Sequence, residues 1–148
     1  MNGPVRTPDP SKIKPAVNRS GNTIRKNCLV GYGTQTVTGE SAIDSLNVAG
    51  VGKIAGVLQH AVSDGDSIDL FTDGDLVLES DGTAAITAGQ QVYAVAGASL
   101  AASGRVAGLP GSPTGGTNYE VVGRALTPAA ATAGAELVVR WERYTYQG

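Results

Sequence analysis

The chain has 148 residues, a formal net charge of −2 and only 16% charged residues, which bounds it to about one domain with a core of its own. Hydrophobic residues make up 41% of the sequence, but many are alanine and valine, so the core must be thin. The 21 glycines are about twice the usual share, which favours many short strands joined by turns. The single cysteine, Cys28, excludes an intramolecular disulfide. No apolar run approaches the length of an export signal or a membrane span, so we expect neither.

Residues 1–27 form a basic, proline-rich segment, here called the N-terminal arm. The arm holds four of the seven prolines and six basic residues against one acid, a net charge of +5, whereas the rest of the chain carries −7. Proline biases the chain toward extended geometry, so the arm is predicted to be extended and buries too little to fold alone. It is either a solvated tail or a segment that orders on a partner by strand addition and charge contacts. The candidate contact residues are Arg6, Lys12, Lys14, Arg19, Arg25 and Lys26.

From Cys28 onward the chain reads as short strands. Gly or Asp-Gly interrupts the sequence every 8 to 12 residues, which is typical of a sandwich or barrel. We therefore predict an all-β fold, with a small β-barrel or sandwich body over residues 28–148 behind the extended arm. Residues 73–75 are predicted to be a hairpin turn, and residues 40–46 or 128–133 could each form a helical turn. The predicted strands are 28–30, 53–58, 68–71, 76–78, 92–96, 119–122 and 137–141.

Part of the body repeats a pattern. Residues 53–58 and 65–70 resemble residues 120–125 and 134–139, and residues 89–95 are a third, partial copy. Each full copy places a glycine inside a strand and follows it with a turn glycine and another strand. A glycine inside a strand indicates a bulge or a close crossing of two backbones, as in a small barrel with sharp corners.

Between the later strands lies a Gly/Pro-rich stretch at about residues 97–118. It has too few large apolar residues to be core and is too long for a tight turn. We predict a loop that protrudes or forms an interface.

The C-terminus collects three aromatic residues, Trp141, Tyr144 and Tyr146. Trp141 shares a strand face with Leu137 and Val139, which favours core packing, whereas the two tyrosines have the opposite parity. Either the strand bulges near residue 143 or the tyrosines face something other than the core. We predict that this aromatic end contributes to a subunit or partner interface.

Catalytic chemistry finds little support in the sequence, so we predict no catalytic residue, no metal site, no cofactor and no enzyme activity. His60 is the single histidine, and no Gly-x-Ser-x-Gly motif occurs. Six aspartates cluster in turns, where turn chemistry explains them better than the alternative of a divalent ion. They are Asp64, Asp66, Asp69, Asp73, Asp75 and Asp81. Nucleic acid is an unexpected partner, because the arm has no aromatic side chain for base stacking and the acidic body repels a polyanion.

The body resembles the capsid cement, or head decoration, proteins of tailed phages. The resemblance covers roughly residues 28–141 and depends on the order and spacing of residues 52–57, the strand after Gly65, residues 87–92, and residues 121–126 leading to 133–139. It implies a homotrimer on the outside of the phage head, bound to the major capsid protein and made in the host cytoplasm. The implied function is a clamp that stabilises the head against internal pressure. The alternatives are a tail or fibre accessory protein and a carbohydrate- or ion-binding β-module.

Overall fold

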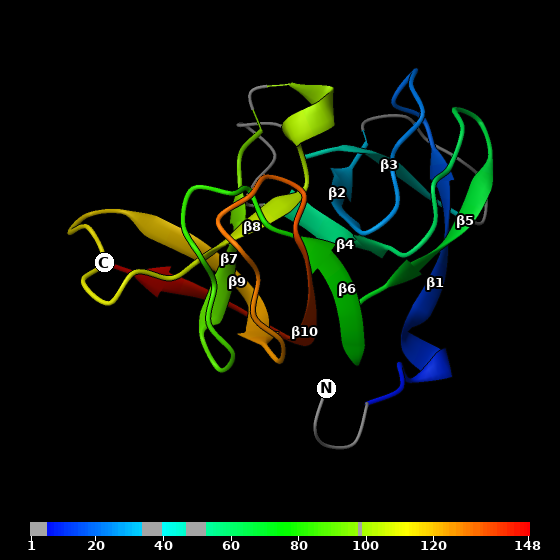
Figure 1. The fold of residues 1–148 in the computed structure, drawn as a ribbon. Helices are drawn as coiled ribbons and strands as arrows, with labels where there is room; N and C mark the ends of the chain where they lie inside the picture. Colours follow the sequence, from blue (N-terminus) through cyan, green and yellow to red (C-terminus); the bar gives the residue numbers. More distant parts are fainter. Residues whose placement is uncertain (1–5, 34–39, 47–52, 98) are drawn as a thin grey trace.

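The structure is a computed structural model that describes residues 6–33, 40–46, 53–97 and 99–148 (Figure 1). It confirms the predicted all-β fold. The strands are β1 (Ile13–Asn18), β2 (Cys28–Tyr32), β3 (Ser41–Ser45), β4 (Ile54–Leu58), β5 (Ser67–Phe71), β6 (Asp75–Glu79), β7 (Gln91–Val95), β8 (Arg105–Gly108), β9 (Asn118–Ala125) and β10 (Glu136–Gln147). The described residues also include the short 3-10 helices η1 (Pro10–Lys12) and η3 (Leu100–Ala102).

The first five strands close into a barrel in the order β1-β3-β2-β4-β5. β1 is parallel to β3 over residues 16–18 and antiparallel to β5 over residues 13–17, so both of its edges are paired at Ala16 and Val17. β2 pairs antiparallel with β3 and β4, and the pairing of Val57 with Phe71 joins β4 to β5. Closure satisfies the backbone groups that an edge strand would offer to another chain.

The last five strands form a second sheet in the order β6-β10-β9-β7-β8, to the left of the barrel in Figure 1. This sheet curls until its edges meet, because Ser80 bridges to Val106 and the Asp81 N–H donates to the Val106 carbonyl at 2.9 Å. β10 pairs with β6 only from Glu136 to Arg140, but its pairing with β9 continues to Gln147. The β9–β10 ribbon therefore extends past β6 to the C-terminus.

Two hydrophobic clusters hold the fold together. One fills the barrel, with Cys28 and Val30 of β2 among its members. The other lies between the barrel and the second sheet, where Leu29 of β2 packs with Leu78 and Val139. Since successive residues of a strand point to opposite faces, the uninterrupted apolar run of β2 supplies both cores. The shared core makes the barrel and the second sheet one packed unit.

The sequence repeat corresponds to two glycines that lie against the following strand. A Cβ on Gly56 of β4 would come within 2.9 Å of Phe71 and Leu70 of β5. A Cβ on Gly123 of β9 would collide in the same way with Arg140 and Val139 of β10. Both positions require glycine because two backbones approach closely, as the repeat predicted.

The N-terminal arm differs from its prediction. Residues 1–5 lie outside the described residues. The rest is extended in part, as β1, but β1 is a barrel strand, and Ala16, Val17 and Ile24 are buried in the body. The boundary at residue 27 therefore does not separate an arm from a body, because burial of these aliphatic side chains holds the extended segment in the barrel. At Ala16 and Val17 both edges of β1 are already paired within the barrel, so these residues cannot add to a partner sheet.

Other loop predictions also differ from the structure. The stretch at 97–118 contains η3 and β8, and Val106 and Ala107 of β8 are buried. Residues 73–75 connect the barrel to the second sheet and are not a hairpin turn, since β5 and β6 belong to different sheets. Residues 41–45, predicted as a possible helical turn, form β3. In each case pairing with distant strands overrides the local preference.

Residues 6–9 fasten the start of the chain to the entrance of β6. The Arg6 backbone N–H donates to the Asp75 carboxylate at 2.6 Å, and its carbonyl accepts from the Asp75 N–H at 2.8 Å. The Asp9 N–H donates to Asp73, which is 8% exposed. Arg140 of β10 holds the other side of Asp75 through two hydrogen bonds of 2.9 and 3.1 Å. Two of the six clustered aspartates thus join the N-terminal segment to the second sheet.

Replacing Asp75 by asparagine should lower the free energy of unfolding by about 1–2 kcal/mol at pH 7. Desolvation opposes ionisation of Asp75, but the Arg140 guanidinium and the Arg6 N–H outweigh it and hold the pKa below its ordinary value of 3.8. A depressed folded-state pKa means that the carboxylate stabilises the fold above pH 3.8 and loses this effect as the pH falls through the folded-state value. Urea unfolding at pH 7 and about pH 2 should show the difference between wild type and variant disappearing in acid. The exposed Asp69→Asn is the control, and a difference that persists in acid would contradict the assignment.

Candidate docking site

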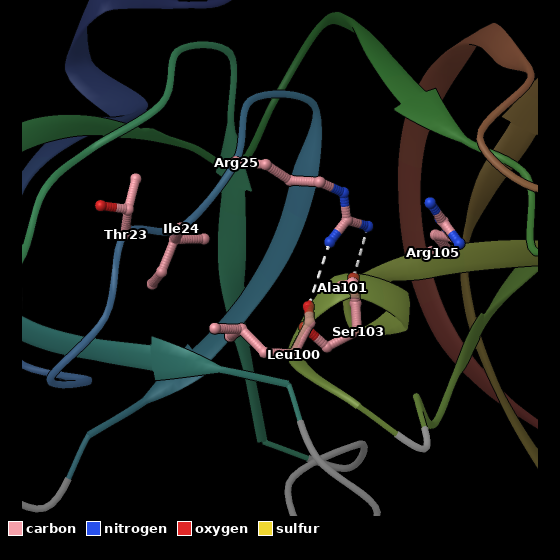
Figure 2. A pocket seen from close by; sticks show the side chains of 7 residues that line it. All are labelled: Thr23, Ile24, Arg25, Leu100, Ala101, Ser103 and Arg105. Carbon is pink, nitrogen blue, oxygen red and sulfur yellow. Dashed lines mark hydrogen bonds between the residues drawn. The ribbon is translucent and has the colours of Figure 1, made fainter.

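The site described here is a hollow of about 550 Å³ at the junction of the barrel and the second sheet. Thr23, Ile24 and Arg25 line it from the segment before β2. The opposite wall consists of Leu100 and Ala101 of η3, Ser103 just after η3, and Arg105 at the start of β8 (Figure 2). We call these seven residues the junction pocket.

Both walls of the junction pocket are held by backbone contacts. Ile24 forms a bridge with Val62, with hydrogen bonds of 2.9 Å in both directions. On the opposite wall, the chain turns at Gly104, which has a φ of +71° and accepts a 3.0 Å hydrogen bond from the Leu29 N–H of β2. This bond ties the segment after η3 directly to the barrel. The two walls are therefore parts of one framework.

Two arginines and one carboxylate form the charged part of the pocket. The Arg25 Nε lies 2.9 Å from Oε1 of Glu79, and the Arg105 Nε lies 3.5 Å from the same oxygen. Arg25 also donates to the Leu100 and Ser103 carbonyls, as the dashed lines in Figure 2 show. The three side chains are mostly covered, with 26%, 19% and 13% of Arg25, Arg105 and Glu79 exposed. Together they carry a net charge of +1.

The rim of the pocket is apolar. Leu100 is 38% exposed, which makes it one of the few large hydrophobic side chains at the surface of the described chain. Ala101 beside it is exposed as well. A smaller hollow of about 230 Å³ lies next to the pocket and shares Leu100 and Ser103 with it. An apolar rim around a cationic floor suits a ligand that carries both an aliphatic group and a negative charge.

The structure does not bring the six basic residues of the N-terminal arm together as one contact surface. Arg6 is engaged with Asp73 and Asp75, and Arg25 with Glu79. The remaining four are exposed and have no ion pair within the described residues; they are Lys12, Lys14, Arg19 and Lys26.

Sequence reasoning missed Glu79, Leu100 and Arg105. Glu79 lies at the end of β6, and the other two lie in the stretch predicted to be a loop. The available signal was Arg105, the single charged residue of that stretch, five positions after a leucine.

The three C-terminal aromatics behave differently from one another. Trp141 is partly buried and packs against the shared core. β10 bulges between Trp141 and Tyr144, which confirms the predicted irregularity near residue 143. Tyr146 lies 6.4 Å from Tyr119 in an edge-to-face contact, and Tyr119 lies 4.9 Å from Tyr93 in another. Their part in a subunit or partner interface stays a prediction.

The remaining candidates for chemistry have structural roles. Burial raises the pKa of the Cys28 thiol to about 11, which disfavours the reactive thiolate. Asp81 accepts from the Thr83 N–H two residues on, which is a turn contact, whereas Asp64 accepts from the Gly21 N–H and joins two segments that are far apart in the chain. His60 is exposed. Among the described residues, no group of three or more His, Cys, Asp or Glu side chains is arranged to hold a metal ion, and no helix is long and apolar enough to cross a membrane.

Two five-stranded units with a shared core define an architecture that is also found in a phage head protein. The chain is similar in structure to the head fiber gp8.5 N base of bacteriophage phi29, with a TM-score of 0.54, 13% sequence identity, and coverage of 90% of this chain and 99% of that one. At this identity, the likeness shows a common fold. No curated protein matches the sequence.

A profile of phage cement proteins matches residues 31–141, which span most of the barrel and the second sheet. The chain belongs to the phage cement protein family and is a capsid-associated structural protein of a phage. This confirms the resemblance that the strand order and spacing indicated.

Proposed function

We propose that this protein binds the outer surface of a phage head and acts as a clamp that stabilises the head against the pressure of its DNA. The observation that carries the proposal is the family match over residues 31–141. The fold supports it, because the core shared by the barrel and the second sheet lets the molecule transmit force between separate contact points.

The partner in this proposal is the major capsid protein, and the clamp is a homotrimer. Three weak contacts joined in one rigid assembly bind far more tightly than each contact alone, because the second and third become intramolecular. The exposed Lys12, Lys14, Arg19 and Lys26 meet acidic groups of the capsid. The edge of the β9–β10 ribbon, with Tyr144 and Tyr146, supplies the contact between subunits.

The experiment combines solution mass, head binding and head stability. The purified protein is first weighed by analytical ultracentrifugation and then sedimented with undecorated heads of the phage that encodes it. We expect three chains per particle, co-sedimentation with heads, and a higher temperature of DNA release. At a free concentration 100 times the Kd, binding stabilises each occupied site by about 2.7 kcal/mol. Heads that bind the protein but release DNA at an unchanged temperature would remove the stabilising role.

A tail or fibre accessory protein is the second candidate; the fold shared with the base of a head fiber favours the fibre part of this alternative and not the tail. Purified tails and purified heads, offered separately at equal mass, distinguish the two. Sedimentation with tails and not with heads would replace the clamp by this alternative.

A further inference from the structure

We propose that the junction pocket is where this protein captures an acidic, aliphatic peptide segment of the head surface. This inference rests on the proposed function and adds the contact site and the chemistry of the partner. A carboxylate of that segment pairs with Arg105 on the pocket floor, and a neighbouring aliphatic side chain covers Leu100 at the rim.

The charges in the pocket favour an acidic partner. Glu79 offers Oε1 to both arginines, but Arg25 takes the shorter contact, at 2.9 Å against 3.5 Å for Arg105. Arg25 is further occupied by the two carbonyl oxygens of the η3 segment. The two terminal nitrogens of Arg105 have no hydrogen-bond partner in the part of the chain that the structure describes. A guanidinium with two free donors matches a carboxylate in a bidentate geometry.

The size and lining of the pocket favour a partner that also presents an aliphatic side chain. A hollow of about 550 Å³ is much larger than one carboxylate needs and falls in the range of sites that enclose side chains. Leu100 and Ala101 would stay in contact with water if only a small anion bound. A peptide that presents an aliphatic side chain next to its acid removes that apolar surface from water. The rigid backbone links at Ile24 and Gly104 keep the two walls at a fixed separation, so the pocket is already formed before docking.

The test places a negative charge at the rim and compares it with the same change elsewhere. Ala101→Glu lies on η3 in the pocket, and Ala88→Glu lies in the turn before β7; both alanines are exposed, so both variants should fold, which thermal melting checks. Binding to undecorated heads is measured by co-sedimentation at about 50 and 200 mM NaCl. We expect at least about tenfold weaker binding for Ala101→Glu and unchanged binding for Ala88→Glu, because like charges repel across a docked contact.

A second variant tests the floor of the pocket. Arg105→Gln keeps the Arg25–Glu79 pair and removes the two free donors. It should weaken head binding and make it less sensitive to salt than the wild type.

Each other outcome overturns a distinct statement. If the wild type binds heads and both alanine variants bind equally well, the pocket is not the contact site, while the clamp proposal stands. Equal losses in both variants would mean that overall charge, and not the pocket, controls binding. A changed oligomeric mass for Ala101→Glu alone would make the occupant a second copy of this chain. If the wild-type protein does not bind heads, the clamp proposal itself is wrong.

Discussion

Replacing Gly104 by alanine should destabilise the protein by about 2–5 kcal/mol, a large part of the 5–15 kcal/mol that typically holds a domain folded. Gly104 has a φ of +71°, a conformation that costs an L-residue about 1–2 kcal/mol. An added Cβ would also collide with the Cys28 Sγ and the Leu29 carbonyl oxygen. Overpacking of this kind adds about 1–3 kcal/mol, because both neighbours lie in the fully buried part of β2.

Gly65→Ala separates the two causes of this loss. Gly65 has a φ of +85°, but nothing lies within 4 Å of the position its Cβ would take. It should therefore show only the backbone cost, about 1–2 kcal/mol. Urea unfolding of both variants at pH 7 measures the difference. Equal losses would show that β2 and the segment before β8 are not as tightly packed as the structure indicates.

Changing Asn18 to aspartate should cost about 3–4 kcal/mol at neutral pH, although the two side chains have nearly the same shape. Asn18 is fully buried at the end of β1. Its Nδ2 donates to the Asn22 carbonyl at 2.7 Å and to the Val62 carbonyl at 3.0 Å. Its Oδ1 accepts from the Ser20 N–H, which fixes the orientation of the amide. A carboxylate would place a second acceptor against two carbonyl oxygens and bury an unpaired charge.

The loss for Asn18→Asp should depend on pH. Burial raises the folded-state pKa of the introduced carboxyl above its unfolded value of about 3.9, so the penalty is complete above the folded-state pKa and shrinks as the pH falls toward about 4. Urea unfolding between about pH 4 and pH 7 follows this change. Asn118→Asp, at the exposed start of β9, is the matched control and should change the stability by less than about 0.5 kcal/mol. An unchanged stability for Asn18→Asp would contradict the assigned hydrogen bonds.

Several features of the fold follow from local patterns and could be predicted without the structure. The apolar runs at 28–30 and 53–58 are strands because β-branched and aliphatic residues there are bounded by glycine turns. The glycines at 56 and 123 lie at close crossings, and β10 bulges where the parity of Trp141 and Tyr144 changes. The order of these strands was also sufficient to indicate the phage cement family.

The candidate site was less predictable, because its parts are far apart in the chain. Arg25 meets Glu79 across 54 positions and the Ser103 carbonyl across 78. From composition, Arg25 was predicted to be one of six basic residues that contact a partner. Residues 97–118 were predicted to form a loop. Neither prediction indicates that Arg25 is mostly buried or that Leu100 and Arg105 lie on the opposite wall of the pocket.

The sequence by itself determined the all-β class, the close approaches at Gly56 and Gly123, and the family, because apolar runs, glycine spacing and the order of both are read along the chain. Only the tertiary structure decided that β1 closes a barrel, that the two five-stranded units share a core, and that the junction pocket has a cationic floor. These features depend on which distant segments pair. β2 and β4 bury both of their faces, so each needs apolar partners on two sides, and the local sequence does not specify which strands those partners are.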